Sequence, residues 1–439
     1  MTDRTQEVLP FPRSARRAVE ASFSGGHITS DGGLLLLLQA DRHLDLLRRL
    51  SLLLPDDRRQ ASVQHSLLSL LRQRVYGLAC GYEDQSDHDE LRHDLLMQTA
   101  VGRDEVLGHS TTLNRLENRA TKAWAWRVHE LLVDTFIARH RTPPTELILD
   151  ADATDDPTHG EQEGRFFHGY YGHYCFLPLY VFCGDFPLVA YLRASNEDGA
   201  RHAWAALALL IERLRQAWPA VRITVRGDSG FCRWKLMRWC DRHGVDYVLG
   251  LARNRRLEAM AGGWLDEAEA ISLETSRSAR LYREVEYAAK TWDRPRRVVV
   301  KAEYLRLSST KRNPRFVVTS LEDPPEQLYR DVYCARGDME NRIKEQQLGL
   351  FADRTSAHRW WSNQLRLLLS TLAYVLINEV RAVGLKGTKM ARAQAWTIRL
   401  KLLKVGAVVV RNTRRVRVLL SSSYPHQELW WLAARKLAG

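Results

Sequence analysis

Two aspartates follow segments that otherwise have the composition of buried β-strands. Residues 146–149 are mostly apolar and lead directly into Asp150 and Asp152. Residues 221–227 alternate between apolar and polar side chains and end at Asp228. Both patterns are typical of strands. Two strand ends are therefore expected to carry carboxylates.

A third acidic residue, Glu340, belongs to a helical pattern. Tyr333, Arg336, Glu340 and Lys344 follow one another at steps of three, four and four residues, which places them on one face of a helix. Such a face is normally apolar, whereas this one carries an aromatic ring, two cations and a carboxylate. The pattern therefore predicts that this helix serves a site.

The three carboxylates together predict a site for divalent cations. Hard cations such as Mg²⁺ take oxygen ligands and are held by a few carboxylates together with substrate phosphates. Two ions roughly 3.5 to 4 Å apart stabilise both the attacking and the leaving oxygen of an in-line displacement. Arg336 and Lys344 would face phosphate, which guanidinium and ammonium groups bind well. We therefore expect Asp152, Asp228 and Glu340 to hold two Mg²⁺ or Mn²⁺ ions.

The charge of the chain predicts a polyanionic partner. The 439 residues have a formal net charge of +13, and residues 380–427 contain eleven Lys or Arg residues and no Asp or Glu. Basic spans without acidic partners usually meet phosphate backbones. Nucleic acid is thus the expected partner, ahead of an anionic membrane, for which the sequence offers no lipidation motif or strongly amphipathic basic helix.

The composition is that of a globular protein with two or three domains, since 45% of the residues are apolar and 27% are charged. The longest apolar stretch, residues 367–377, is too short to span a bilayer, and residues 1–7 lack the apolar core of a signal peptide. We therefore expect a cytosolic protein. The six cysteines form no Cys-x-x-Cys pair, so neither a zinc ribbon nor a disulfide framework is indicated.

Residues 1–141 are predicted to form a helical domain that binds DNA ends. Apolar residues recur at helical spacing in residues 34–38, 44–54, 63–78 and 123–137. Residues 62–74 have features of a helix-turn-helix, but a plain packing helix explains them equally well, so no recognition helix is assigned. A Thr-Pro-Pro-Thr segment at 142–145 marks the boundary.

An α/β core is predicted over residues 142–252, with a mixed sheet covered by helices. A Gly184-Asp185 turn separates two apolar runs, which predicts a β-hairpin. The expected strands are residues 147–149, 174–183, 187–192, 221–227 and 247–251, and the expected helices are residues 200–218 and 234–243.

Residues 253–329 are predicted to form an all-β insertion, with strands at 281–287, 297–304 and 315–319. The core then resumes over residues 330–383 with the Glu340 helix and a long core helix at 357–383. The last segment, residues 384–439, is basic. Two β-branched runs around Asn412 predict a hairpin that presents Arg414, Arg415 and Arg417.

Six motifs are spread over nearly the whole chain. In order, they are Gly25-Gly-His-Ile-Thr-Ser-Asp-Gly-Gly, Gly81-Tyr-Glu-Asp-Gln-Ser-Asp-His-Asp, Asp152-Ala-Thr-Asp-Asp-Pro-Thr-His-Gly, Arg226-Gly-Asp-Ser-Gly-Phe, Gly337-Asp-Met-Glu-Asn-Arg-Ile-Lys-Glu and Arg414-Arg-Val-Arg-Val-Leu-Leu. With them, the chain resembles insertion-sequence DDE transposases with an RNase-H-like catalytic core. It resembles most closely the insertion sequence 1380 family, which has the group 1 DDE transposase domain.

The resemblance implies that Asp152, Asp228 and Glu340 are the catalytic, metal-binding triad. The implied reaction is metal-dependent phosphoryl transfer in DNA transposition, a form of DNA recombination. Water cuts a phosphodiester at the element's end, and the freed 3′ hydroxyl then attacks target DNA. The implied partners are terminal inverted repeats, target DNA and a second copy of the chain in a homodimeric synaptic complex. The implied location is the bacterial cytoplasm, at the nucleoid, with no membrane partner.

The resemblance also implies DNA contacts on the Glu340 helix. Tyr333, Arg336 and Glu340 match the Tyr-x2-Arg-x3-Glu part of a signature in the related insertion sequence 4 group, where the Tyr and Arg contact transposon-end phosphates. That signature places a Lys seven residues after the Glu, where this chain has Gln347. Lys344, one helical turn beyond Glu340, is therefore expected to substitute for it.

Two other interpretations remain open at this point. One is an RNase-H-like nuclease that cuts without joining, and the other is a catalytically inactive, transposase-derived regulator that binds DNA. The identity of the first metal ligand is also open, because Asp150 and Asp152 share a strand face and either could fill this role. The Asp-x-Thr match favours Asp152. Taken singly, each acid also has a structural explanation as a turn residue or as half of a surface ion pair.

Overall fold

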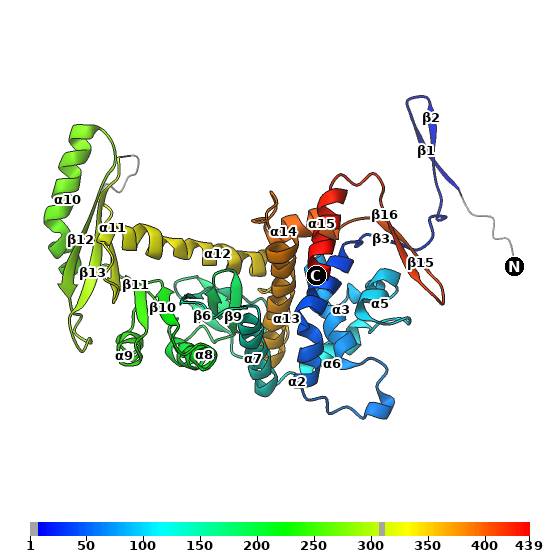
Figure 1. Cartoon of the computed structure of the whole chain (residues 1–439), viewed down its shortest axis with the longest axis horizontal. Helices are drawn as coiled ribbons and strands as arrows, with labels where there is room; N and C mark the ends of the chain where they lie inside the picture. Colours follow the sequence, from blue (N-terminus) through cyan, green and yellow to red (C-terminus); the bar gives the residue numbers. More distant parts are fainter. Residues whose placement is uncertain (1–7, 307–311) are drawn as a thin grey trace. The chain divides into compact units, whose positions relative to one another are not determined.

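The computed structural model describes residues 8–306 and 312–439, which form a mixed α/β structure (Figure 1). These residues divide into two compact units. The terminal unit contains the chain up to Ala120, together with Gly349–Phe351 and Leu372–Gly439. The sheet unit contains Thr121–Leu348 and Ala352–Thr371. The N-terminal and C-terminal regions, which the sequence suggested as separate segments, thus belong to one unit.

The sheet unit is built on an eight-stranded sheet, which is mixed, as the sequence predicted for the core. Its strand order is β12-β13-β14-β11-β10-β4-β8-β9. In this order β11, β10 and β4 run parallel to one another, and every other neighbouring pair is antiparallel. The strands are β4 (Glu146–Ala153), β8 (Leu179–Cys183), β9 (Phe186–Tyr191), β10 (Arg222–Gly227), β11 (Asp246–Leu251), β12 (Ala279–Tyr287), β13 (Arg296–Tyr304) and β14 (Arg315–Thr319).

The predicted helices and hairpin of the core are confirmed. α8 (Ala203–Ala217) precedes β10, and α9 (Trp234–His243) is the crossover between the parallel strands β10 and β11. β8 and β9 form the hairpin about Gly184-Asp185. The strand predicted at 174–183 is interrupted at Pro178, because proline cannot donate to a strand ladder, and its first part is the short strand β7 (His173–Phe176). β7 pairs with β5 (Asp156–Pro157) and β6 (Phe166–His168).

The prediction of an all-β insertion over residues 253–329 is wrong. A 21-residue helix, α10 (Arg255–Thr275), lies within it, and β12, β13 and β14 extend the central sheet beyond β11. The side chain of Asn254 caps the helix by accepting a hydrogen bond from the backbone N–H of Leu257. Gly262 and Gly263 concealed the helix in the sequence, since each lowers helix propensity by about 1 kcal/mol relative to alanine. Apolar residues at helical spacing nevertheless fill its buried face: Leu257, Ala261, Leu265 and Ala268.

A long helical stretch follows the insertion and carries Glu340 (Figure 1). It begins with α11 (Pro325–Gln327) and continues through a π-helical turn at 328–333 and a tighter turn at 334–336 into α12 (Gly337–Lys344). Another π-helical turn follows at 345–349. Met339 and Ile343 form the buried face of α12. Single π-helical turns inside helices occur frequently at functional sites.

The core helix predicted at residues 357–383 is confirmed as α13 (Trp360–Glu379). Together with the turn that continues to Gly384, it is long and apolar enough to cross a membrane by length and composition. However, 89% of its most apolar window is buried inside the protein. This burial is typical of a core helix. α7 itself (Lys122–Ala138) is the helix predicted at 123–137 and belongs to the sheet unit.

The terminal unit is mainly helical but also contains strands that the sequence did not predict. Strands β1 (Leu9–Ser14) and β2 (Arg17–Ala21) pair with each other, and β3 (Ile28–Thr29) joins β15 (Ala407–Arg411) and β16 (Val416–Leu420) in a second sheet. The hairpin predicted around Asn412 is confirmed as β15 and β16. The helices are α1 (Leu34–Leu44), α2 (Leu46–Leu53), α3 (Leu67–Cys80), α4 (His88–Leu91), α5 (Leu95–Val101), α6 (Ser110–Asn118), α14 (Ala395–Ile398) and α15 (Gln427–Ala438).

The first sequence motif has a structural role in the terminal unit. The Gly33 N–H donates to the Leu403 carbonyl at 3.0 Å, and a Cβ at position 33 would lie 1.8 Å from the Leu402 carbonyl oxygen. Only glycine permits this approach. Lys404 and Asp31 form an ion pair of 2.7 Å beside it. These contacts join the N-terminal motif to the segment before β15.

Candidate active site

Strand register places Asp152 and Asp228 at the same edge of the sheet. In the parallel pair of β4 and β10, Asp150 lies opposite Arg226, and Ala151 lies opposite Gly227. Asp152 follows Ala151 and Asp228 follows Gly227, so both acids come directly after the last residues that pair between the two strands. Both residues lie at the C-terminal ends of their strands, and these ends meet at one edge of the sheet because the strands are parallel. The sheet therefore brings together two carboxylates that are 76 residues apart in sequence.

The turn after β10 packs against Tyr333. The Asp228 carboxylate accepts a hydrogen bond from the Gly230 N–H at 2.8 Å. On β11, a Cβ at position 250 would lie 2.6 Å from the Tyr333 hydroxyl and 3.2 Å from the backbone carbon of Asp228. Gly250 thus leaves the room that both groups occupy. Tyr333 reaches the sheet edge on which Asp228 lies.

Arg336 connects the other two acids. Its guanidinium donates to Asp152 Oδ2 at 3.1 Å and to Glu340 Oε1 at 2.5 Å. The Asp152 and Arg336 side chains are 14% and 17% exposed, whereas Glu340 is 44% exposed. The predicted helix face therefore turns Arg336 and Glu340 toward the end of β4, and one cation is shared by carboxylates from a strand and a helix.

The site holds more negative charge than its one cation neutralises. Burial raises the pKa of Asp152 to about 6, and the Asp228 and Glu340 carboxylates add to the rise, while Arg336 and the Ala153 N–H oppose it. Burial lowers the pKa of Arg336, but Asp152 and Glu340 outweigh burial, so the net shift is upward. A further positive charge would therefore be stabilised here.

Asp150 belongs to a buried ion pair instead. Its two carboxylate oxygens accept hydrogen bonds of 2.5 and 2.7 Å from Arg226, and the two side chains are only 6% and 8% exposed. Burial raises the pKa of Asp150, and the hydrogen bonds from Arg226 oppose the rise. Arg226 also donates to the Val332 carbonyl at 2.5 Å. The pair thus fastens the Glu340 helix to strands β4 and β10.

Two more contacts fix this helix. Arg342 pairs with Asp185 in the β8–β9 turn at 2.5 Å. Gln347, which stands where the wider signature has a Lys, donates to the Asp155 carbonyl at 2.9 Å. Lys344 is exposed. Gln347 therefore holds the helix in place, and Lys344 presents a positive charge to solvent.

The carboxylates suit a divalent cation in donor type. Within residues 8–306 and 312–439, no three His, Cys, Asp or Glu side chains converge closely enough to coordinate one ion. The Arg336 guanidinium lies between Asp152 and Glu340 and supplies the positive charge there. Mg²⁺ and Mn²⁺ nevertheless prefer oxygen ligands, which the three carboxylates supply, and the net negative charge of the site favours a cation.

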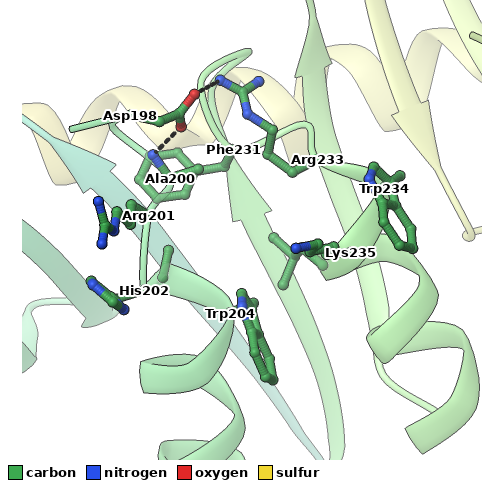
Figure 2. Close-up of a pocket in the computed structure, with 11 residues that line it drawn as sticks. Asp198, Ala200, Arg201, His202, Trp204, Phe231, Arg233, Trp234 and Lys235 are labelled. Atoms are coloured by element: carbon green, nitrogen blue, oxygen red, sulfur yellow. Dashed lines mark hydrogen bonds and ion pairs between the residues drawn. The ribbon is translucent and has the colours of Figure 1, made fainter. Parts of the chain in front are cut away.

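A pocket of about 430 Å³ lies beside the turn that follows Asp228 (Figure 2). Arg233 pairs with Asp198 across it at 2.7 Å, and Trp204 is 43% exposed. No residue of this pocket was predicted as a site residue from the sequence. Its signal is the Arg-Trp-Lys run that begins five residues after Asp228. The aromatic and cationic residues that line the pocket are Arg201, His202, Trp204, Phe231, Arg233, Trp234 and Lys235.

The predicted basic hairpin lies in the terminal unit. The Asn412 side chain accepts hydrogen bonds of 3.0 Å from the backbone N–H groups of Arg414 and Arg415, which closes the turn. Arg414, Arg415 and Arg417 are all exposed. The hairpin therefore presents three cations to solvent.

Comparison with known proteins identifies the family. A family model described as transposase DDE domain group 1 matches residues 11–439. No match was found among curated proteins. Among solved structures, the chain is similar to a piggyBac transposase synaptic complex with hairpin DNA, at 12% identity and a TM-score of 0.42, over 85% of this chain and 79% of that one. A likeness this weak supports no conclusion. Because the family model covers nearly the whole chain, the chain belongs to the group 1 transposase DDE domain family and is a DNA transposase.

Proposed function

We propose that this DNA transposase cuts transposon ends and joins them to target DNA at a site formed by Asp152, Asp228 and Glu340. The bridge from Asp152 through Arg336 to Glu340 carries the proposal, because it joins the end of β4 to the helix. Asp228 is close enough to raise the pKa of Asp152. Both steps are in-line displacements and so can use the same groups.

The sheet order supports an RNase-H-like core. In the order β9-β8-β4-β10-β11, three antiparallel strands are followed by two that run parallel to β4. The acidic residues lie at the C-terminal ends of β4 and β10, which is where open α/β sheets bind ligands. The finer assignment to the insertion sequence 1380 family rests on the six sequence motifs.

Two Mg²⁺ or Mn²⁺ ions are the proposed cofactors, held by Asp152, Asp228 and Glu340. When bound, such ions neutralise charge on the phosphate and lower the pKa of the attacking oxygen. The three carboxylates would hold the ions at the sheet edge, and Arg336 would bind the phosphodiester there. Burial of Asp152 excludes water from one side of the site.

Arg336 is proposed to exchange its partners when DNA binds. Its guanidinium now satisfies Asp152 and Glu340, and a DNA phosphate offers the same bidentate acceptor geometry. The exchange would release both carboxylates for cations. Tyr333 and the exposed Lys344 would contact neighbouring phosphates, because both lie on the helical stretch that carries Arg336.

The residues that line the pocket beside Asp228 are of the types that bind a DNA strand. Aromatic rings stack on bases without regard to sequence, and nearby cations bind the backbone. Trp204 is partly exposed, and Lys235 lies 5.8 Å from the ring centroid of Trp234. We therefore propose that the strand leading away from the reacting phosphate enters this pocket.

The remaining partners are also proposed. Terminal inverted repeats and target DNA are the substrates, and a homodimer holds two ends in a synaptic complex in the bacterial cytoplasm, at the nucleoid. The terminal unit, which contains both residues 8–120 and the basic hairpin, binds the ends. Arg414, Arg415 and Arg417 would contact the DNA backbone, because they are exposed and no acid interrupts their segment.

A strand-transfer assay tests the proposal. Purified protein, Mg²⁺, a labelled duplex that carries an inverted repeat from the DNA flanking the coding region, and a target plasmid are combined. Joined products are expected, and Asp228→Asn and Glu340→Gln should abolish both cutting and joining while end binding persists. Glu258→Gln, an exposed carboxylate on α10, is the matched control and should keep full activity.

Other outcomes identify the alternatives. Nicked ends without joined products would indicate a nuclease. A gel shift without any cleavage would indicate a DNA-binding regulator. Loss of both cleavage and DNA binding in Asp228→Asn and Glu340→Gln would indicate that these acids are structural.

A further inference from the structure

The helix suggested by the helix-turn-helix features of residues 62–74 cannot enter a DNA groove. These residues lead into α3, and twelve of the 14 residues of α3 are buried. α3 instead serves as the packing core for α5 and α6. α3 is therefore not available as a recognition helix.

α6 has one buried and one exposed face. Leu113, Leu116 and Glu117 are buried. Thr111, Asn114 and Arg115 are exposed, and Asn118 is partly exposed. Positions 111, 114, 115 and 118 lie on one helix face. That face carries the side chains that read base edges in the major groove, since Arg pairs with guanine and Asn with adenine.

A buried polar network holds α6 in place. Arg74 on α3 pairs with Glu117 at 3.2 Å, and the two side chains are 5% and 2% exposed. Gln73 donates to the Gly108 carbonyl at 2.7 Å and accepts from the Gly108 N–H at 3.0 Å. The Asp89 carboxylate accepts from the Ser110 N–H at 2.8 Å. Because base reading requires side chains on a rigid support, this anchoring suits a recognition helix.

The surroundings of this face are basic. Arg115 and Asn118 line a pocket of about 650 Å³ whose other cationic members are Arg58, Arg59 and Arg119. Asp56 and Asp57 pair with Arg58 and Arg119. Among the described residues, Arg59 and Arg115 form no ion pair. Burial lowers the pKa of His65 in this pocket, and Arg103 and Arg92 lower it further, which indicates a positive local potential.

We propose that α6 is the recognition helix of this transposase and enters the major groove of duplex DNA at the transposon end. Arg115 would read a guanine, and Asn114 and Asn118 would read adenines. Without DNA these amides are engaged locally, because Asn118 donates to Asn114 at 2.7 Å and Asn114 donates to Gln85 at 3.2 Å. Bases would replace these weak surface contacts. This inference rests on the proposed function, because transposon ends are the duplexes to be read.

Arg59 would contact a phosphate beside the helix. It lies on the loop before α3 and is exposed, whereas Arg119 is held by Asp56 and Asp57. Phosphate contacts set the orientation of a recognition helix but carry no sequence information. Charge complementarity with two phosphate backbones therefore favours duplex DNA as the occupant of this surface.

Selection from a randomised 30-base-pair duplex library tests the inference with the full-length protein. The wild-type chain should enrich one motif. Arg115→Lys, which keeps the charge but loses the planar fork, should weaken binding to that motif by roughly 5- to 150-fold and leave binding to unselected duplex unchanged. Asn114→Ala should relax the preference at a different base pair. Arg42→Ala, an exposed arginine on α1, is the control and should enrich the wild-type motif.

The outcomes separate this inference from the proposed function. If Arg115→Lys and Asn114→Ala enrich the wild-type motif with unchanged affinity, α6 does not read bases, although strand transfer can still proceed. If the wild-type chain enriches no motif, the inference is also overturned, and the strand-transfer assay then decides the proposed function alone. Loss of strand transfer in Asp228→Asn, together with a changed selection in Arg115→Lys and Asn114→Ala, supports both. Circular dichroism of each variant confirms that folding is intact.

Discussion

Asp150 and Asp152 stand two residues apart on one strand face, and their replacement should change stability in opposite directions. Asp150→Asn leaves the Arg226 guanidinium buried without a counterion, because both side chains of the pair are less than 10% exposed. Breaking such a pair from one side costs roughly 3 to 5 kcal/mol. In a unit of this size, that cost lowers the thermal midpoint by roughly 6 to 20 °C.

Asp152→Asn should have the reverse effect. The pKa of Asp152 rises from 3.8 to about 6 on folding, which corresponds to about 3 kcal/mol of destabilisation by the ionised carboxylate. Because the folded pKa is the higher one, stability falls as pH rises from about 4 to 6 and stays low above that range. At pH 7.5 the asparagine variant should therefore be more stable than wild type. At pH 4 the difference should vanish.

Differential scanning calorimetry at pH 7.5 and pH 4 measures both effects. The double variant Asp150→Asn, Arg226→Met is the control, because replacing both members of a buried pair by groups of similar volume is often neutral. It should recover most of the stability that Asp150→Asn loses. If Asp152→Asn instead lowers the midpoint at pH 7.5 as much as Asp150→Asn, ionised Asp152 does not destabilise the fold and the contrast between the two aspartates is wrong.

Three further changes test other parts of the structure. Burial lowers the pKa of His88 to about 3, so the unfolded chain gains its proton first, and this residue should cost the fold about 2 kcal/mol between pH 7 and pH 5. His88→Gln should flatten the pH dependence of urea unfolding, whereas the exposed His93→Gln should not. Gly33→Ala should lower the free energy of unfolding, measured in urea, by about 3 kcal/mol, because its Cβ would collide with a carbonyl. Gly262→Ala, in open space on α10, should raise it by about 0.5 to 1 kcal/mol. Equal effects would contradict both assignments. Alanine replacement of Arg414, Arg415 and Arg417 should weaken the salt dependence of DNA binding. The slope of log K against log salt concentration should fall by roughly 0.9 for each phosphate contact removed. An unchanged slope would exclude the hairpin as a DNA surface.

The strands and helices near the acids were predictable because their patterns are local. Residues 221–227 alternate as a half-buried strand does, and the steps of three and four residues around Glu340 are those of a helix. β10 and α12 both lie where these patterns indicate. Their roles in catalysis stay a prediction, because spacing identifies a helix face but not its ligand.

Contacts between distant segments were not predictable from pattern. Alternation gives Asp150 and Asp152 the same face, and only the register of β4 against β10 decides which of them meets Arg226. The bridge from Asp152 through Arg336 to Glu340 likewise depends on tertiary placement. Similarly, β3 and β15 pair across more than 370 residues of sequence, and no periodicity of either strand indicates its partner.

Metal-directed cleavage of the protein backbone tests most directly whether the three acids form one cation site. Fe²⁺ takes the place of Mg²⁺, and ascorbate with peroxide generates hydroxyl radicals that cut the chain next to the bound ion. The protein is incubated with duplex DNA so that Arg336 can bind phosphate, and the fragments are mapped by mass spectrometry. We predict cuts near Asp152, Asp228 and Glu340 together, suppressed by excess Mg²⁺ and lost in Asp228→Asn. Cuts confined to other segments, or cuts that Asp228→Asn leaves unchanged, would contradict a shared site.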